Sequence, residues 1–408
     1  MAPSVDREPS LQAAKEPGAP CPHYPQCVGC RLIGQPYGQQ LQWKQDHLAE
    51  LVRTAWGPSG PSVGTIVGSP EAFGYRNQAK LVLRRSERRG LLVGLFRPGT
   101  HTVVDIRDCP VHHPFIQVTL ARIIPLLEES NLPTYDERTR LGTLRYLVLR
   151  ASRWTKSVQV ILVTARELDR PLLALLRRVA RLPRVRSVVH NYNPSPGNVI
   201  FGDRFTPVTR ESTLRERIGD LKFKTHAGAF LQANIPVANR IYNYAAAAAQ
   251  TEANDIVADL YCGVGALTFH LAPRAKLTVG IEESPVAAAD ARSNLRWNGF
   301  HNVRILTATA QDGVKELQKR FGSVGVIALN PPRKGVDAET REGIVQLAPR
   351  RIVYVSCNPT SLIRDLQWFE SHGYHTDHIQ PFDMFPQTDH IECVATLERA
   401  STGAKPTR

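Results

Sequence analysis

The sequence predicts an α/β fold, with a doubly wound, mostly parallel sheet in its C-terminal part and a smaller α+β domain before it. The chain has 408 residues, enough for two or three domains. From about residue 221, short apolar runs alternate with helical segments, as buried parallel strands joined by helices do. These runs lie at 256–261, 277–281, 303–307, 324–329 and 352–355, and two more follow near 374 and at 391–397.

We expect four segments along the chain. Residues 1–20, rich in Pro, Ala, Ser and charge, predict a disordered tail. Residues 21–60 hold three cysteines and then a helix from about Gln39 to Trp56, which Gly57-Pro58 ends. Residues 61–217 alternate short strands and helices, which predicts the α+β domain. Residues 218–408 form the C-terminal domain, where Asn234 caps a helix.

Charge favours a polyanionic partner. The net charge is +14, and arginines cluster within the α+β domain. Basic side chains neutralise phosphates, which favours RNA; alternatively, these charges only cover solvated faces. The sequence shows no run of about 18 apolar residues and no signal-peptide pattern. We therefore expect a cytoplasmic protein that does not contact membranes.

Four of the seven cysteines have the spacing of a metal site. An odd number of cysteines in a cytoplasmic chain argues against a disulfide framework. Cys21, Cys27 and Cys30 lie close in sequence, and Cys109 follows in the α+β domain. Four thiolates can hold either a [4Fe–4S] cluster or zinc, and would then pin the N-terminal segment to that domain. The alternative is four unrelated reduced thiols.

A glycine loop follows the first apolar run of the C-terminal domain. In Asp259-Leu-Tyr-Cys-Gly-Val-Gly, Gly263 and Gly265 let the backbone approach a ligand closely. Glu282, at the end of the next run, can accept hydrogen bonds from ribose hydroxyls. A dinucleotide site would need a third glycine or alanine where Thr268 stands. The shorter loop fits S-adenosylmethionine, whereas an ordinary turn beside a solvated carboxylate is the alternative.

Three further residues predict the chemistry. Amine methyltransferases place an aromatic residue after an Asn-Pro-Pro turn, so Arg333 in Asn330-Pro-Pro-Arg argues against methylation of an amine. Cys357 ends one apolar run and Glu392 opens the last. A thiolate that adds to carbon 6 of uracil makes carbon 5 nucleophilic, and a base must later remove the carbon-5 proton. Cys357 is the candidate nucleophile and Glu392 the candidate base, if the last strand runs antiparallel to its neighbours.

These candidates have simpler readings too. Cys357 could be a small buried hydrophobic residue, and Glu392 could pair with an arginine. Asp383 is a competing base. Cys262 and Cys393 lie within apolar strands, and we interpret them as structural.

Together the motifs resemble those of the bacterial RNA 5-methyluridine methyltransferases. The matching segments are Phe230-Leu-Gln-Ala-Asn, Asp259-Leu-Tyr-Cys-Gly-Val-Gly, Gly280-Ile-Glu, Asn330-Pro-Pro-Arg-Lys-Gly, Ser356-Cys-Asn-Pro and Met384-Phe-Pro-Gln-Thr-Asp-His-Ile-Glu. The resemblance implies a class I, Rossmann-like methyltransferase domain with a seven-stranded sheet, and an RNA-binding role for the α+β domain. It also implies Cys357 as nucleophile, Glu392 as base, and a methyl-donor site formed by Gln232, Tyr261, Glu282 and Asn330.

The resemblance further implies a [4Fe–4S] cluster on Cys21, Cys27, Cys30 and Cys109. Asn330 stands where many members have aspartate, and too few residues precede Cys21 for an N-terminal TRAM barrel. Both features are similar to the branch that modifies 23S ribosomal RNA, the RlmC branch. We expect 23S ribosomal RNA as the substrate, transfer RNA as its nearest rival, and a monomer. Two other hypotheses are a non-catalytic iron–sulfur RNA-binding protein and a cytosine carbon-5 methyltransferase.

Overall fold

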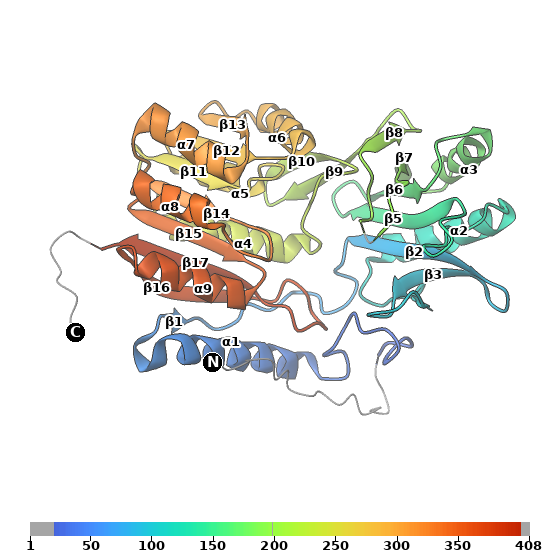
Figure 1. Ribbon diagram of the computed structural model, residues 1–408, viewed down its shortest axis with the longest axis horizontal. Helices are drawn as coiled ribbons and strands as arrows, with labels where there is room; N and C mark the ends of the chain where they lie inside the picture. The colour runs from blue at the N-terminus through green and yellow to red at the C-terminus, as the bar shows by residue number, and fades with distance from the viewer. Residues whose placement is uncertain (1–19, 198, 401–408) are drawn as a thin grey trace.

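The computed structural model describes residues 20–197 and 199–400, which form two sheet-centred parts lying side by side (Figure 1). The tail expected at 1–20 falls outside these residues, apart from Pro20. Across the described residues, no helix has both the length and the apolar character needed to span a bilayer.

The C-terminal domain is built on a sheet with the strand order β1-β16-β17-β15-β14-β11-β12-β13. Five strands, β11 to β15, run parallel to their neighbours among themselves, whereas β17 is antiparallel to β15 and β16. The strands are β11 (Ile256–Leu260), β12 (Leu277–Glu282), β13 (Val303–Thr307), β14 (Val326–Leu329), β15 (Arg351–Ser356), β16 (Tyr374–Phe382) and β17 (Glu392–Arg399). The expected seven strands are therefore joined by an eighth, β1 (Ser62–Val63), from the N-terminal part of the chain.

Helices bury both faces of this sheet. The helices are α4 (Ile235–Ala248), α5 (Ala266–Leu271), α6 (Pro285–Asn298), α7 (Ala310–Phe321), α8 (Ala338–Leu347) and α9 (Pro359–Glu370), with a 3-10 turn η2 (Ala272–Arg274) after α5. Alternate residues of β15 show the two cores: Val353 and Val355 pack toward α4 and α5, and Ile352 and Tyr354 toward α7, α8 and α9. A strand buried on both faces must be apolar throughout, which explains the continuous apolar runs in the sequence.

The N-terminal helix belongs to the C-terminal domain by packing. Helix α1 (Tyr37–Trp56), followed by a 3-10 turn η1 (Gly57–Ser59), contributes Leu48 and Val52 to the core that α7, α8 and α9 share. It lies beside β1, the edge strand that pairs with β16 (Figure 1). The expected separate segment at 21–60 is thus divided: its helix packs on the C-terminal sheet, and its cysteines lie near the middle domain.

The middle domain has a seven-stranded sheet with the order β4-β3-β2-β5-β6-β7-β8. Its strands are β2 (Gln78–Ser86), β3 (Gly90–Phe96), β4 (Val103–Asp105), β5 (Leu144–Ser152), β6 (Ser157–Thr164), β7 (Val185–Tyr192) and β8 (Arg204–Pro207). Helices α2 (Pro114–Glu129) and α3 (Arg170–Ala180) cover one face. The segment around Phe201 and Phe205 packs on the other face.

A two-stranded hairpin joins the two domains. It consists of β9 (Thr213–Ile218) and β10 (Leu221–His226), so the domain boundary predicted at 217/218 falls inside it. On the middle-domain side, buried Glu216 accepts hydrogen bonds from the backbone N–H groups of Arg153 (2.8 Å) and Trp154 (3.1 Å). Buried Arg150 donates to the Thr225 hydroxyl (2.7 Å) and to the carbonyl of His226 (2.7 Å).

Helix α6 holds the other edge of the hairpin. Asn298, Asn294 and Asp290 accept hydrogen bonds from the backbone N–H groups of alternate β10 residues, Lys222 (2.9 Å), Lys224 (2.7 Å) and His226 (2.8 Å). The three α6 residues are four positions apart, which corresponds to a rise of about 6 Å along a helix. The three β10 residues are two positions apart, or about 6.7 Å along a strand, so each side chain lies opposite one backbone N–H group. Three side chains thereby take the place of a neighbouring strand along an edge that would otherwise be open.

Candidate active site

The predicted site residues meet at one edge of the C-terminal sheet. Parallel strands β11, β12, β14 and β15 end at this edge with the glycine loop, Glu282, Asn330 and Cys357. Strand β17 is antiparallel, and Cys393 pairs with Ser356, so Glu392 begins β17 beside Cys357. The antiparallel orientation on which the prediction of Glu392 depended is therefore present.

This edge faces the middle domain. The loop between β16 and β17 extends toward β2 (Figure 1). Its Pro386 carbonyl accepts a hydrogen bond from the hydroxyl of buried Tyr75 (2.9 Å), and Gln387 donates to the carbonyl of Ala72 (3.2 Å). The middle domain is thus fixed directly against the loop that leads into Glu392.

The glycine loop is shaped for a close ligand. Tyr261, Gly263 and Gly265 all have positive φ, at 65°, 56° and 89°. A Cβ atom on Gly265 would meet the Phe269 ring at 2.6 Å, so packing requires this glycine. A Cβ on Gly263 would meet no atom within 4 Å, so this glycine borders open space. Positive φ together with free space at Gly263 is the geometry of a backbone that a ligand can approach.

Glu282 closes the loop on its other side. One carboxylate oxygen accepts the N–H of Gly263 (2.9 Å), and the other accepts the N–H of Ser284 at the start of α6 (2.9 Å). A carboxylate can accept about four hydrogen bonds. Glu282 is therefore held in place and still has lone pairs for ligand hydroxyls.

Asp259 is a residue whose importance the sequence analysis missed. It is fully buried in β11; one oxygen accepts a hydrogen bond from the hydroxyl of Thr268 (2.6 Å), and the other has no partner among the described residues. Burial raises the pKa of Asp259 to about 7. Thr268 thus holds a buried carboxyl group beneath the loop. Its presence in place of the glycine or alanine of the dinucleotide pattern was the one sequence signal that could have pointed to this role of Asp259.

Cys357, Glu392 and Arg333 lie together at this edge of the sheet. Glu392 is only 3% exposed, and burial raises its pKa to about 7 although Arg333 lowers it. Burial, and then the nearby Glu392, raise the pKa of the half-buried Cys357 thiol, while Arg333 again lowers it. His390 (3.2 Å) and Asn358, whose amide donates to the Arg333 carbonyl (3.0 Å), hold Arg333 in this position. From the sequence, Arg333 argues against amine methylation and suits contacts with phosphate or carbonyl groups, and the structure places it beside the thiol.

The remaining predicted donor-site residues are Gln232, Tyr261 and Asn330. Gln232 is buried and lies beside Tyr242 of α4. Tyr261 lies beside Thr340 and Asp337 at the start of α8, and burial raises its pKa to about 12. Asn330 follows β14, and its N–H donates to the carbonyl of Leu260 (3.4 Å). Cys262 and Cys393 are buried, in agreement with their interpretation as structural residues.

Asp383 is occupied elsewhere. It is completely buried and 2.6 Å from the ammonium group of Lys44, which is also completely buried and donates to the Phe385 carbonyl (3.1 Å). Removing one member of a buried ion pair leaves an uncompensated charge, at a cost of about 3–5 kcal/mol. This pair ties α1 to the β16–β17 loop, which leaves Glu392 as the stronger candidate base.

Comparison with known proteins agrees with this site. Residues 36–400 match the family model described as tRNA (Uracil-5-)-methyltransferase. The chain belongs to this family. Two relatives, each described as an uncharacterized RNA methyltransferase, come from Halalkalibacterium halodurans and Geobacter sulfurreducens, and both are 36% identical to this chain. The alignments cover 93% and 92% of this chain and 83% and 76% of those proteins.

One solved structure is similar to this family member over most of its length. It is the Pyrococcus abyssi tRNA (uracil-54, C5)-methyltransferase in complex with S-adenosyl-L-homocysteine. It is 28% identical, with a TM-score of 0.74, and the match covers 91% of this chain and 86% of that one. The resemblance predicted from the motifs is confirmed, and so is a mixed α/β methyltransferase fold.

The four cysteines of this uracil methyltransferase family member gather in one region. Burial, and then the neighbouring thiols of Cys109, Cys27 and Cys21, raise the pKa of Cys30 to about 12. Within residues 20–400 apart from 198, however, no group of three or more Cys, His, Asp or Glu side chains is arranged to hold a metal ion. The thiols are neighbours, but the structure does not establish the predicted metal site.

Proposed function

We propose that the protein transfers a methyl group from S-adenosylmethionine to carbon 5 of uridine in RNA. The observation that carries this proposal is the thiol of Cys357 beside the buried Glu392 and Arg333. The glycine loop, Glu282 and Asn330 lie at the same sheet edge. Membership of the uracil-5 methyltransferase family supports the reaction, and the Pyrococcus abyssi enzyme bound to S-adenosyl-L-homocysteine supports the methyl donor.

In this proposal, Gln232, Tyr261, Gly263, Glu282 and Asn330 bind the donor. Glu282 accepts hydrogen bonds from the ribose hydroxyls, because its lone pairs are only partly used by Gly263 and Ser284. The open space at Gly263 admits the ligand next to the backbone. The bound donor supplies an electrophilic methyl group at a sulfonium centre.

The Cys357 thiolate then adds to carbon 6 of the uracil ring. As the S–C6 bond forms, the C5–C6 π electrons shift toward carbon 5 and the neighbouring carbonyl. Carbon 5 then attacks the methyl group, the bond between that methyl group and the donor sulfur breaks with its electron pair left on sulfur, and S-adenosylhomocysteine is released. Glu392 next removes the carbon-5 proton, the S–C6 electron pair returns to sulfur, and the ring double bond re-forms. The Arg333 cation stabilises the thiolate at the start and at the end of this cycle.

Many members of the family have an aspartate at the position of Asn330, whereas the branch that modifies 23S ribosomal RNA has an asparagine there. We therefore further propose 23S ribosomal RNA as the substrate. Transfer RNA is the second candidate, which the family description and the Pyrococcus abyssi tRNA enzyme favour. In either case the target base must leave its stack to reach the half-buried Cys357.

Methylation of purified RNA tests the function. The wild-type protein is incubated with methyl-labelled S-adenosylmethionine and either 23S ribosomal RNA or transfer RNA, and the nucleosides are identified by mass spectrometry. We expect 5-methyluridine with the wild type, and a rate lower by about three orders of magnitude or more for Cys357→Ala. Cys357→Ala should still bind the donor in calorimetry. Undiminished methylation by this variant, or 5-methylcytidine as the product, would exclude the mechanism.

We also propose that Cys21, Cys27, Cys30 and Cys109 bind a [4Fe–4S] cluster with a structural or RNA-positioning role. The proximity of the four thiols supports this, although their present arrangement is not that of a metal site. Such a cluster would join the N-terminal segment to the middle domain and would take no part in methyl transfer.

Metal analysis of protein purified without oxygen tests the cluster. We expect about four iron and four sulfide per chain. Cys27→Ser should lose both, whereas Val28→Ala, a change at the exposed residue between two of the cysteines, should retain them. Stoichiometric zinc without sulfide would instead establish a zinc site, and absence of both metals would reject the proposal.

A further inference from the structure

The two faces of the β9–β10 hairpin differ sharply in composition. One face is buried and holds Leu214, Glu216, Ile218, Phe223 and Thr225. The exposed face carries Arg215 and Arg217 from β9 and Lys222 and Lys224 from β10. Because alternate residues of a strand point to the same side, these four cations share one surface.

On this exposed face, like charges stand directly opposite each other. Lys224 pairs with Arg215 and Lys222 with Arg217 in the hairpin register. Like charges directly opposite in an antiparallel pair are destabilising. Arg215 and Arg217 have carboxylate partners, Glu211 (2.8 Å) and Asp220 (2.7 Å). Among the described residues, no carboxylate lies within 4.0 Å of the ammonium group of Lys222 or Lys224. In the free protein, each of these two lysines therefore lies opposite an arginine, and the repulsion between the two cations lowers the stability of the hairpin.

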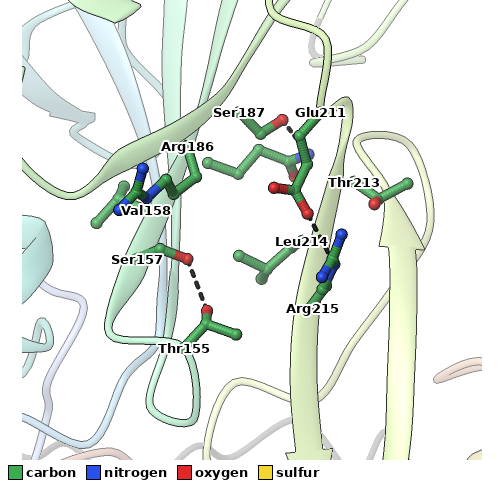
Figure 2. Close-up of a pocket in the computed structure, with 10 residues that line it drawn as sticks. Thr155, Ser157, Val158, Arg186, Ser187, Glu211, Thr213, Leu214 and Arg215 are labelled. Atoms are coloured by element: carbon green, nitrogen blue, oxygen red, sulfur yellow. Dashed lines mark hydrogen bonds and ion pairs between the residues drawn. The ribbon is translucent and has the colours of Figure 1, made fainter. Parts of the chain in front are cut away.

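The same face continues into a groove against the middle domain. A cavity of about 240 Å³ lies between the hairpin and strands β6 and β7, with Arg186 and Arg215 on opposite sides (Figure 2). An adjoining hollow of about 450 Å³ is lined by Arg210, Arg215 and Lys224, and Glu211 and Thr213 border both spaces. Arg186 and Arg210 are exposed. The groove thus extends the basic surface beyond the hairpin.

Aromatic side chains flank one end of this surface. The Lys224 ammonium group lies 4.8 Å from the ring centre of Trp297 on α6, and Trp297 lies 5.9 Å from Trp154 of the β5–β6 turn. Trp154 is 38% exposed. Trp297 is half-buried, so Trp154 is the indole that a base can reach. An exposed indole beside cations is the combination that stacks a base while the cations hold the phosphates.

The basic surface also leads toward the active site. The chain passes from Lys224 through exposed Phe230 to Gln232, and eight residues span at most about 29 Å. An RNA segment on the hairpin and a nucleotide at Cys357 can therefore belong to the same folded RNA.

We propose that the exposed face of the β9–β10 hairpin, with Arg186 and Arg210, is a second RNA-binding surface that holds the sugar–phosphate backbone next to the methylated nucleotide. This inference rests on the proposed function, because it takes RNA as the substrate. RNA relieves the cross-strand repulsion by placing phosphates between the like charges. A compact anion does not need a surface of this length or the flanking indoles.

Binding of a 23S ribosomal RNA transcript at several salt concentrations tests the surface. We compare the wild type with Lys222→Ala/Lys224→Ala and with a matched control, Lys315→Ala/Lys319→Ala, on the exposed side of α7 at the far end of the C-terminal domain (Figure 1). The hairpin variant should bind about tenfold more weakly, and its dependence of log Kd on log salt should be less steep by about 1.5 to 2, the loss of two phosphate contacts. The α7 variant should behave as the wild type.

Thermal unfolding and steady-state methylation complete the test. The melting temperature of the hairpin variant should stay close to that of the wild type, because removal of the lysines relieves repulsion but also removes the contact of Lys224 with the Trp297 ring. Its KM for RNA should rise while kcat at saturating RNA changes less than twofold. Equal weakening in both variants, or an unchanged salt dependence in a folded hairpin variant, would overturn the inference. If the wild type bound RNA through the hairpin but methylated none, only the proposed function would fail.

Discussion

At the scale of single residues, the site depends on two buried carboxyl groups with raised pKa values. Asp259 and Glu392 both have pKa values of about 7, chiefly because burial disfavours their charged forms. Their surroundings differ: Asp259 is held by Thr268 beneath the glycine loop, and Glu392 lies beside Cys357 and Arg333. Asp259 thus lies under the loop that we propose binds the methyl donor, and Glu392 lies where the proposed mechanism requires a base.

The raised pKa of Glu392 predicts opposite pH dependences of activity and stability. The base must be ionised, so the methylation rate at saturating substrates should fall as pH drops through about 7. The folded protein holds this proton more tightly than the unfolded chain, whose ordinary value is 4.5. Stability should therefore decline as pH rises from about 4.5 to about 7. Rates and melting temperatures measured across pH 5 to 8 check both trends.

Glu392→Gln isolates the contribution of this residue to stability. Cys357 also has a raised pKa and steepens the activity profile, and Asp259 adds a stability change of the same sign. Glu392→Gln should remove part of the stability loss below pH 7. The exposed Glu342→Gln on α8 should leave it intact. An identical pH dependence in both variants would show that Glu392 titrates normally.

How far the sequence predicted the site also becomes clear at this scale. Cys357, Glu392, Glu282 and Asn330 were predictable because each ends or begins an apolar run, and run ends meet at a sheet edge. Asp259 was predicted only as part of the glycine-loop motif, and Arg333 only as a residue for phosphate or carbonyl contacts; neither the buried carboxyl group of Asp259 nor the position of Arg333 beside Cys357 was predicted. Their importance comes from burial and from contacts with residues far away in sequence, which strand periodicity does not report.

At the scale of secondary-structure elements, the ladder from α6 to β10 is the least predictable connection. Asn294 is fully buried; it accepts the N–H of Lys224 (2.7 Å) and donates to the carbonyls of Lys224 (3.1 Å) and Val264 (3.3 Å). The sequence shows Asp290, Asn294 and Asn298 at a spacing of four, which is equally typical of a solvated helix face. That these three side chains bind the backbone of β10 becomes apparent only when the position of β10 beside α6 is known.

We predict that Asn294→Ala destabilises the protein by about 2–4 kcal/mol, because it leaves a buried N–H and two carbonyl groups without a partner. Chemical denaturation measures this loss. The neighbouring Ser293→Ala should change the free energy of unfolding by less than about 0.5 kcal/mol, since the Ser293 side chain makes no hydrogen bond within the described part of the chain. A loss below 1 kcal/mol for Asn294→Ala would mean that water satisfies this edge of β10.

At the scale of the whole molecule, two domains and a returning N-terminal helix enclose one site. The two-domain α/β architecture was predictable from the apolar runs. The addition of α1 and β1 to the C-terminal sheet was not, because the partners lie far apart in sequence: Lys44 meets Asp383, 339 residues away, and Ser62 pairs with His378, 316 residues away. Domain boundaries predicted from the order of segments in the sequence cannot show that an N-terminal segment packs on the C-terminal domain.

This arrangement has a consequence for substrate binding. The sheet edge that carries Cys357 faces the middle domain, and the hairpin that joins the two domains carries basic residues on its outer face. A folded RNA can contact the joining hairpin and present one nucleotide to Cys357 at the same time. The shape of the RNA around the target uridine should therefore matter as much as the uridine itself.

Covalent trapping of RNA tests the thiolate mechanism most directly. Glu392→Gln is mixed with RNA and S-adenosylmethionine and analysed on a denaturing gel. Without a base, the methylated ring cannot lose its carbon-5 proton, so we expect a protein–RNA band that accumulates and contains a methylated uridine bound to Cys357. The double variant Cys357→Ala/Glu392→Gln should give no such band. Absence of the band with a folded, RNA-binding Glu392→Gln protein, or its persistence in the double variant, would contradict covalent catalysis by Cys357.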